Sequence, residues 1–304
     1  MSLTLLFEEM QGKFAFIFLF SVVIEWLVLV INHKINSNKG GLVNLLSYFV
    51  ELLPYFVLDV FFFGLMVWFY HYRLFDLGNA WYIWILCYLL YDLLFYIIHY
   101  LGHRVRFFWC IHGVHHTAEE MKLTVAVRGS FFGFLLTPHN TLWLPLLGFD
   151  PFMVLIVDGI AKIYGLFEHV NEHFISAKGG WIEKLFITPS AHRVHHSKNH
   201  VYLDRNYGET FSFWDHLFGT FQKELEQETP TYGMMDDKID GTNLWQVQTI
   251  LWKELWHDVK TAPSFKDKLH YLIKPPGWNH VDGGKFAEEF RAEALEKLKT
   301  SNNQ

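Results

Sequence analysis

The chain has 304 residues, of which 51% are hydrophobic, 18% are aromatic and only 18% are charged. Soluble domains carry about 25% charged residues, so this composition argues for a protein whose outer surface meets lipid. The net charge of −6, without a clustered run of Lys and Arg, argues against a nucleic-acid-binding protein.

Three apolar segments in the first third of the chain predict membrane helices. Residues 14–31, 44–71 and 80–101 each approach or exceed the ~20 mainly apolar residues that a membrane span needs. Pro54 lies inside the second segment and predicts a kink there. The first segment is not a cleaved signal peptide, because Glu25 interrupts it and no small-residue cleavage site follows. The alternative, buried helices of a soluble α protein, is disfavoured by the length of these segments.

Two shorter apolar stretches, residues 131–147 and 150–167, follow and predict a helical hairpin. No later segment is long and apolar enough to span, and residues 282–304 are charged and helix-prone. We therefore expect an all-α, multi-pass integral membrane helical bundle with about four to five spans. Its expected parts are N-terminal membrane helices at 1–79, a central domain at 80–235 and a C-terminal soluble tail at 236–304.

The positive charges predict an orientation. The loop at 32–43 carries Lys34 and Lys39, so the positive-inside rule places it in the cytoplasm. Counting crossings from there puts residues 99–130, and everything after residue 167, on the cytoplasmic side. All the clustered histidines fall in these two regions. We therefore expect a helical, histidine-rich cap on the cytoplasmic face of the bundle.

The 18 histidines are the most unusual feature of the sequence. They include HxxxH at 99–103, HxxHH at 112–116, HxxxH at 169–173 and HxxHH at 192–196. From composition alone, an HxxHH string is expected roughly 0.06 times in a chain of this length, so two copies are a poor match to chance. On a helix, residues i, i+3 and i+4 share one face, so each string can direct two or three imidazoles at one point.

So many clustered imidazoles predict a metal centre. Histidine suits zinc, copper, iron and nickel, and one zinc ion takes four ligands. Eight to ten histidines therefore indicate two metal ions, although their spacing does not separate iron from zinc. The two cysteines, Cys87 and Cys110, have no CxxC partner. They indicate neither a thiolate site nor a disulfide, and we expect both to be small buried thiols.

These histidine strings resemble the signature of the fatty acid hydroxylase and sterol desaturase superfamily. The segment from Thr188 to Thr220 adds TPSAHRVHH, DRNYG and WDHLFGT, which are similar to further strings of that family. PTYG at 230–233 and PPGW at 275–278 look like its alkylglycerol monooxygenase branch. The resemblance covers residues 80–235 and is specific for the superfamily rather than for one substrate.

The resemblance implies a non-haem di-iron centre on the cytoplasmic face of a helical membrane bundle. Eight ligands match the family strings directly. His169 is added because HVN resembles a further family segment, and His173 is a tenth candidate without a clear counterpart. The expected metal ligands are therefore His99, His103, His112, His115, His116, His169, His173, His192, His195 and His196.

Two departures from the family pattern bear on the substrate. Lys122 stands in a stretch where the family usually has Asn, and Ala126-Val127-Arg128 replaces an Ala-Leu-Arg string. This stretch is expected to line the substrate entrance, so the departures leave substrate choice open.

Metal-binding histidines usually donate their second N–H to a carboxylate or a carbonyl. Asp92 lies within a predicted span, where acidic groups are costly and often functional. It precedes His99 by two helical turns, or ~10.5 Å, so it is expected to support a histidine of another string, or else to bond to a neighbouring helix. The expected supporting residues are Asp92, Glu168, Asp204, Asn206 and Asp215.

The implied function is a membrane monooxygenase that hydroxylates a C–H bond of a lipid (fatty acyl, sterol or ether lipid) with O2. No dinucleotide, haem or iron–sulfur motif is present. We therefore expect two electrons from a separate donor protein or, as the alkylglycerol branch suggests, from tetrahydrobiopterin. The expected location is the bacterial inner membrane or the endoplasmic reticulum.

Two alternatives stay open from the sequence. A lipid desaturase would use the same di-iron site and differ only in its product. A histidine-rich membrane metal transporter or metal store belongs to another class, but transporters place their ligands near the midplane of the membrane, often between repeats. No repeat is visible in this chain, and its histidines gather beyond the predicted spans. The sequence does not specify an oligomeric state.

Overall fold

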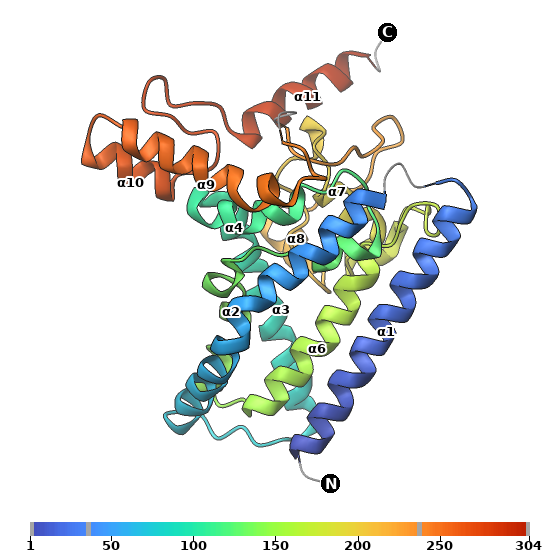
Figure 1. The fold of residues 1–304 in the computed structure, drawn as a ribbon, viewed down its shortest axis with the longest axis vertical. Coiled ribbons are helices and arrows are strands. Elements are labelled where there is room, and N and C mark those ends of the chain that lie inside the picture. Colours follow the sequence, from blue (N-terminus) through green and yellow to red (C-terminus); the bar gives the residue numbers. More distant parts are fainter. Residues whose placement is uncertain (1–2, 35–37, 236–238, 302–304) are drawn as a thin grey trace.

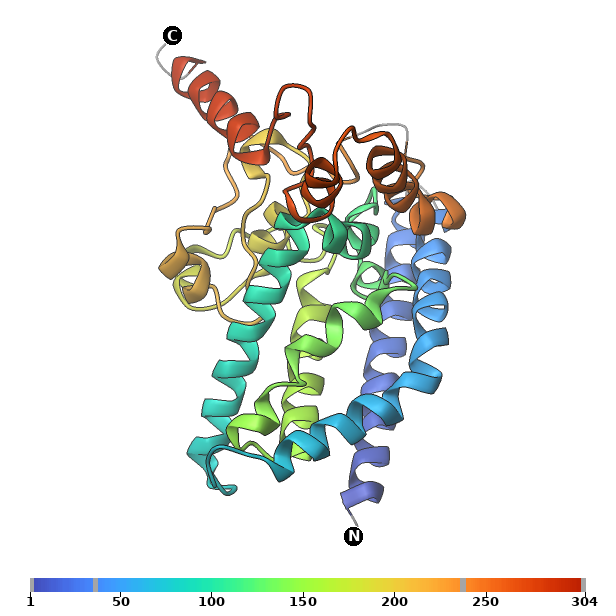
Figure 2. The same ribbon diagram turned by 90° about the vertical axis from the view of Figure 1, so that its left-hand side faces the viewer.

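The computed structural model describes residues 3–34, 38–235 and 239–301, and every regular element within these ranges is helical, as the sequence predicts. Four helices form one bundle (Figure 1): α1 (Leu3–Ile31), α2 (Asn38–His71), α3 (Trp81–Arg104) and α6 (Pro151–Glu168). The remaining helices lie mostly beyond one end of this bundle (Figure 2). We call that end the cap, which comprises residues 105–122, 169–235 and 239–301.

Shorter elements complete the fold. The turns between the cap and α6 are η1 (Leu123–Val127), η2 (Gly133–Leu135), η3 (Thr137–Asn140) and α5 (Leu144–Leu147). The cap contains α4 (Arg106–His116), η4 (Gly180–Lys184), α7 (Pro189–His195), η5 (His200–Tyr202), α8 (Phe213–Phe218), α9 (Leu244–Thr261), α10 (Phe265–Ile273) and α11 (Ala287–Ser301).

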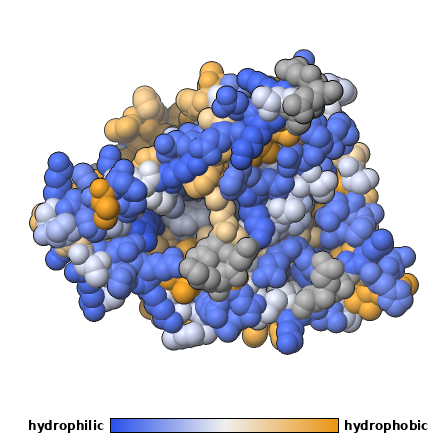
Figure 3. Space-filling model, turned by 90° about the horizontal axis from the view of Figure 1, so that it is seen from above, coloured by the Kyte–Doolittle hydropathy of each residue, from blue (hydrophilic) through white to orange (hydrophobic). Residues whose placement is uncertain are grey.

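The outer surface of the bundle is apolar. By length and composition, α2 and α3 are able to cross a membrane, and α1 contributes a shorter apolar stretch at Phe16–Ile31. Phe56 and Val60 on α2 are 90% and 80% exposed. Extended exposed apolar surfaces mark contact with a membrane or a partner. The apolar surface here runs along the long helices, as expected for helices that lie in a membrane. The end face of the cap, seen in Figure 3, is mainly hydrophilic.

The predicted hairpin at 131–147 and 150–167 forms only in its second arm, which is α6. The first arm was predicted wrongly, because it is broken into η2, η3 and α5 instead of one helix. Pro138 and Pro145 each stand in the first positions of a new turn, since proline cannot donate the backbone hydrogen bond that a continuous helix requires. Gly148, with a φ of 113°, then ends α5.

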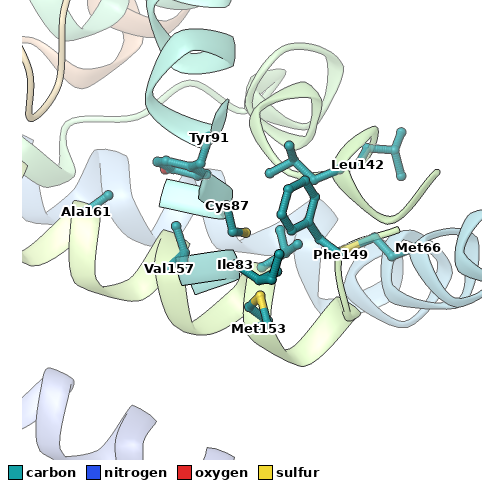
Figure 4. Packing of buried hydrophobic residues seen from close by; sticks show 11 residues of the cluster. Met66, Ile83, Cys87, Tyr91, Leu142, Phe149, Met153, Val157 and Ala161 are labelled. Atoms are coloured by element: carbon teal, nitrogen blue, oxygen red, sulfur yellow. The ribbon is translucent and has the colours of Figure 1, made fainter. Parts of the chain in front are cut away.

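Helices α2, α3 and α6 are joined by the largest buried apolar cluster (Figure 4), which includes Met66, Cys87, Tyr91 and Val157. Fully burying an apolar side chain of this size stabilises a fold by ~1.5–3 kcal/mol. Cys87 in this cluster and Cys110 in the cap are both buried, free thiols, as expected. The cluster fixes α3 relative to α6, and both helices lead to histidines at the cap.

Candidate metal centre

The structure brings nine of the ten expected histidine ligands into two adjoining groups. Within each group the potential ligand atoms lie within 4.8 Å of one another. The five-histidine group contains His99, His103, His112, His116 and His195, and the four-histidine group contains His115, His169, His192 and His196. The tenth candidate, His173, is exposed and lies outside both groups.

Each HxxHH string supplies both groups. On α4, His115 belongs to the four-histidine group while the next residue, His116, belongs to the five-histidine group. At the end of α7, His195 and His196 divide in the same way, in the opposite order. Neighbouring residues on a helix point about 100° apart, so one helix can face two metal sites at once. The HxxxH string at 99–103 on α3 supplies only the five-histidine group.

The loop at 204–207 supports three rings of the five-histidine group. Two of its backbone carbonyl oxygens lie 2.8 Å from Nδ1 of His99 and 2.9 Å from Nδ1 of His195. The carboxylate of Asp204 lies 3.3 Å from Nδ1 of His103. An Nδ1–H that donates to such an oxygen leaves Nε2 with a free lone pair. The Nε2 atoms of His103 and His195 are buried without a hydrogen-bond partner, as a metal site requires.

An unusual backbone turn directs these carbonyls. Asp204 and Asn206 have φ angles of 54° and 57°, in the left-handed region that Asp and Asn tolerate better than most residues. The Asn206 amide donates to the carbonyls of Ala191 and Gln222, and its Oδ1 accepts from the N–H of Gln222. The DRNYG string is therefore a turn that is fixed against the start of α7.

Asp215 and Asp92 hold the residues that follow this turn. Asp215 accepts the N–H groups of Tyr207 and Gly208 at 2.8 and 2.9 Å, and Asp92 accepts that of Thr210 at 2.8 Å. Burial raises the pKa of Asp215 to about 6, although its hydrogen bonds oppose this shift. Neither carboxylate has a hydrogen bond with a histidine. Asp92 therefore does not support a histidine ring. It is a buried acid that accepts hydrogen bonds from the backbone of a neighbouring segment, which was the alternative interpretation of this residue.

The end of α6 supports the four-histidine group. Nδ1 of His169 lies 2.7 Å from the carbonyl oxygen of Gly165. Glu168 Oε2 lies within ion-pair distance of Nδ1 of His192, at 3.4 Å, although this Nδ1 has no hydrogen-bond partner. Nε2 of His169 is 2.9 Å from Nε2 of His192 and 3.2 Å from Nε2 of His115. These separations fit nitrogens that each lie about 2.0–2.1 Å from one shared ion.

Burial favours the neutral form of these imidazoles, which is the form that binds metal. Desolvation lowers the pKa of His169 to about 4. For six further histidines of the two groups, desolvation is again the largest cause of a lowered pKa, and the neighbouring histidines lower each pKa further. This applies to His112, His115, His116, His192, His195 and His196. The cap therefore holds a preformed set of neutral nitrogen donors.

The donor set fits two metal ions with a common accessible side. Every histidine in the two groups is buried except His112 and His115, which are half-buried. These two rings come from different groups, and their centroids are 5.6 Å apart on α4. Nitrogen donors alone suit zinc, copper, iron or nickel. His112 and His115 are thus the histidines of the two groups that keep the most contact with the surface.

Two aromatic residues next to the five-histidine group were missed from the sequence. The Tyr207 ring packs edge-on against His99 and His103, with centroids 5.8 and 5.2 Å away, and its hydroxyl is buried without a partner. The Trp109 ring lies 5.1 Å from His103 and 5.5 Å from His116. Trp109 lies three residues before the HxxHH string at 112–116, and Tyr207 lies within the DRNYG string, so these positions were the available signal.

Two buried charged residues tie the membrane helices to the cap, and sequence analysis gave neither a partner. Glu25 of α1 accepts the N–H groups of Leu123 and Asn171 at 2.7 and 2.9 Å. Arg128 is 1% exposed and donates to Asn44 of α2 at 2.6 Å and to backbone and hydroxyl oxygens of the cap. Desolvation lowers the pKa of Arg128 to about 10, so it is charged at neutral pH.

Comparisons with known proteins agree with this geometry. Residues 84–220 match the fatty acid hydroxylase family. The chain is similar to alkylglycerol monooxygenases from Xenopus tropicalis (31% identity over 218 residues, 68% of this chain and 45% of that protein) and Homo sapiens (29% over 221 residues, with the same shares).

It is also similar to an ornithine lipid hydroxylase from Rhizobium tropici (30% over 147 residues, 48% of this chain and 44% of that protein). The chain thus spans less than half the length of these curated relatives. No solved structure matches it.

Proposed function

We propose that this chain, which belongs to the fatty acid hydroxylase family through residues 84–220, is a membrane-bound di-iron monooxygenase that hydroxylates a C–H bond of a lipid. The observation that carries the proposal is the convergence of nine histidines into two adjoining groups. Imidazole ligands alone suit several metals. The membrane setting and the family favour iron, and the hydroxylase and monooxygenase names of its relatives favour insertion of oxygen.

The chain's own residues would hold two iron ions and keep water away from them. Hydrogen bonds from Nδ1 atoms to the carbonyls of Gly165 and of the loop at 204–207 orient three of the rings. Burial of the ligands lowers the local dielectric and restricts solvent. The bound metals would supply the activation of O2, which is chemistry that side chains do not provide. The half-buried rings of His112 and His115 leave one side for O2 and the substrate.

The proposed substrate is an alkyl or acyl chain that reaches the centre from the membrane. The apolar outer surface of α1, α2 and α3 retains the protein in lipid, and the histidines follow directly at the end of α3. Relatives are named for alkylglycerol and for an ornithine lipid, so an ether lipid or an acylated lipid is the preferred class. Two electrons must come from a separate donor, and we place the centre on the cytoplasmic face because of Lys34 and Lys39.

Two other functions give different expectations. A desaturase would use the same ligands but would produce an alkene instead of an alcohol. A metal transporter would place its ligands along the spans near the membrane midplane. The two histidine groups instead draw on the cap and on the last turns of α3, which favours an enzyme over a transporter.

Metal content and product analysis test the proposal together. Purified protein should contain about two irons per chain, and it should convert an ether or acyl lipid to an alcohol, or to an aldehyde from a hemiacetal, only with O2 and a reductant. His195→Ala and His192→Ala should each lose iron and product. His173→Ala, an exposed histidine outside both groups, is the matched control and should retain both.

Outcomes of this experiment separate the alternatives. An alkene product would identify a desaturase. A folded protein that binds no metal, or that stays inactive after iron reconstitution in the presence of lipid, O2 and reductant, would contradict the proposed function.

A further inference from the structure

Helices α9 and α10 of the cap carry large apolar side chains on their exposed surface. These side chains are 44% to 82% exposed, and they belong to Trp245, Trp256, Phe265, Leu269 and Ile273. Single apolar residues scattered on a surface are ordinary, whereas a set that gathers on neighbouring helices marks contact with a membrane or a partner. Both helices lie outside residues 84–220, which match the family.

The exposed side of α10 is its apolar side. Phe265, Leu269 and Ile273 follow one another at intervals of four residues, so they form one stripe along the helix. Tyr271 lies on the opposite side, where it is buried and packs against Trp278 with ring centroids 4.9 Å apart. A surface helix of a soluble domain turns its apolar stripe to the core. In α10 the other side meets the core, and the apolar stripe faces outwards.

The contacts of Trp252 show which way the indoles of α9 point. Trp245, Trp252 and Trp256 are separated by seven and four residues, or two turns and one turn, so they share one face of the helix. The Trp252 ring packs against Phe107, at the start of α4, and against Phe132, in the segment that leads from the cap into the bundle. This face of α9 is therefore turned towards the bundle, and the exposed indoles near its two ends point the same way.

The position of these helices brings their apolar faces to the level of a membrane surface. At the level of the cap, α9 and α10 extend sideways beyond the bundle (Figure 1). Seen from the cap end, the left-hand lobe in which they lie is mainly hydrophilic (Figure 3). The apolar stripe of α10 is thus directed mostly away from that end face. A bundle that spans a membrane would place this pair of helices on the lipid surface beside it.

The apolar surface of α9 continues into the bundle. Phe131 and Phe132 are both exposed, and Phe132 is in contact with Trp252. The next residue, Gly133, packs against the carboxylate of Glu51 on α2, because a Cβ at Gly133 would lie 2.6 Å from Oε1 of Glu51. The exposed indoles of α9 are therefore joined by exposed phenyl rings to α2, one of the two helices that are able to cross a membrane.

The charges of α9 and α10 complement an anionic surface. Residues 244–274 contain five lysines and three acidic residues, whereas the whole chain has a net charge of −6. Lys253 and Lys260 lie over the rings of Trp245 and Trp256, 5.4 and 4.9 Å from their centroids. Tryptophan beside lysine is typical of membrane interfaces, because the indole lies at the level of the head groups while the ammonium reaches the phosphates.

We propose that α9 and α10 lie on the surface of an anionic lipid bilayer beside the bundle, with their exposed apolar faces among the lipid head groups. The inference rests on the membrane setting of the proposed function. Helices that bind a membrane surface combine such an apolar face with lysines on the polar side. The Cys110 thiol of α4 donates to the Leu251 carbonyl of α9 at 3.4 Å. Since α4 carries three of the nine histidines, the contact would hold the histidine-bearing cap against the membrane.

Spin labels on single introduced cysteines test this contact in full-length protein reconstituted in bilayers. Leu269→Cys and Trp256→Cys place a label on the proposed faces. Val60→Cys on α2 is the lipid reference and Glu296→Cys on α11 the water reference, and all four positions are exposed. Both native cysteines are buried, and the parent chain gives their background. Labels at 269 and 256 should resemble the label at 60, with high accessibility to O2 and low accessibility to a water-soluble nickel complex. Readings like those at 296 would overturn the proposal.

The lipid composition tests the role of the lysines. Compared with phosphatidylcholine alone, bilayers that also contain phosphatidylglycerol should raise the ratio of lipid-exposed to water-exposed label at position 269. Lys266→Gln and Lys274→Gln together should lower this ratio, by about fivefold for each lysine that lies near the anionic surface. Lys299→Gln on α11 is the matched control and should leave the ratio unchanged. Equal ratios in both bilayers and in both variants would overturn the contact with anionic lipid.

Other readings of the same labels identify a different partner. A label at 269 that is strongly immobilised and shielded from both O2 and the nickel complex would overturn the lipid surface in favour of a protein partner. Loss of that immobilisation when the protein is diluted in the bilayer would identify the partner as a second copy of this chain.

These readings require neither metal nor product, so they separate this inference from the proposed function. A lipid-exposed label at 60 with a water-exposed label at 269 would overturn this inference alone. A water-exposed label at 60 would show that the bundle is not in the membrane, and both proposals would fail. If every label reads as expected but no lipid is oxidised, only the proposed function fails.

Discussion

The two histidine groups differ in how the chain supports them. The five-histidine group relies on backbone carbonyls and a carboxylate from one tight loop, at 204–207. The four-histidine group relies on the end of α6, through the Gly165 carbonyl and the Glu168 carboxylate. The five-histidine group therefore depends on an unusual turn, and the four-histidine group depends on a helix terminus. The last carbonyls of a helix lack partners within the helix, so they are free to accept a hydrogen bond from a histidine. Changes to one support should affect one metal more than the other.

Removing a ligand should give the largest effect. His195→Ala in the five-histidine group and His192→Ala in the four-histidine group each delete a buried nitrogen donor. We expect iron to fall from about two to about one per chain, or lower, and activity to fall by well over ~100-fold, more than loss of a supporting contact costs. Elemental analysis and turnover measure this. Normal iron content in both variants would show that these histidines are not ligands.

Removing a supporting carboxylate should give a smaller and selective effect. Asp204→Asn weakens the partner of His103, and Glu168→Gln weakens the partner of His192. Loss of such partners typically costs 10–100-fold in metal affinity. Metal titration of each variant should show a larger loss of affinity at the site that has lost its support than at the other site. Equal weakening of both sites would mean that the loop at 204–207 and the end of α6 do not each support one histidine group.

Changing the turn itself should affect stability. Asn206→Ala removes three hydrogen bonds and places a Cβ residue without a polar side chain at a φ of 57°. We expect a loss of roughly 1–3 kcal/mol in the free energy of unfolding. Asn206→Gly should lose less, because glycine adopts this φ freely. Thermal unfolding in detergent ranks the two. A larger loss in the glycine variant would argue that the backbone angle is not the constraint.

The smallest effect is expected at Gly102, between the two histidines of α3. A Cβ there would lie 3.3 Å from Cβ of His112, so Gly102→Ala should push α4 by a few tenths of an ångström. We expect a few-fold weaker metal binding, on the order of 0.5–1 kcal/mol, with the larger effect in the five-histidine group, to which His112 belongs. Gly64→Ala is the control, because a Cβ at Gly64 meets nothing within 4 Å. Equal titration curves for the two variants would contradict this packing argument.

Sequence patterns predicted which histidines lie close together but not how they divide into two groups. The two HxxHH strings identified six of the nine histidines that converge, and the two HxxxH strings identified the other three, His99, His103 and His169. They did not predict that His115 and His116 belong to different groups, because that depends on where α3, α6 and α7 lie around α4. His173 shows that a histidine string can also predict a ligand that does not join either group. It shares an HxxxH string with His169, but the chain leaves helical geometry at His169, so the i, i+4 argument does not apply there.

The supporting residues were predicted less well for a similar reason. Asp204 and Glu168 contact histidines as expected, whereas Asp92, Asn206 and Asp215 act on the backbone instead. A carboxylate near a histidine string shows that a partner is available, but not whether it binds a ring or an N–H group. The prediction of one helix at 131–147 failed because the two ends of this segment are strongly apolar, although the polar run at 137–141 interrupts them. Pro138 and Pro145 were the sequence signal for breaks in this segment, but the hydrophobic residues around them favoured the prediction of a continuous helix.

The division of α4 and α7 between the two groups has a thermodynamic consequence. Because each helix carries ligands for both groups, an ion bound in one group orders the backbone that presents the ligands of the other. The second ion then binds a site whose ordering has already taken place, and such coupling is reciprocal. Loading should accordingly be cooperative. During a metal titration, chains with two ions should accumulate alongside chains with none, and singly loaded chains should be scarce.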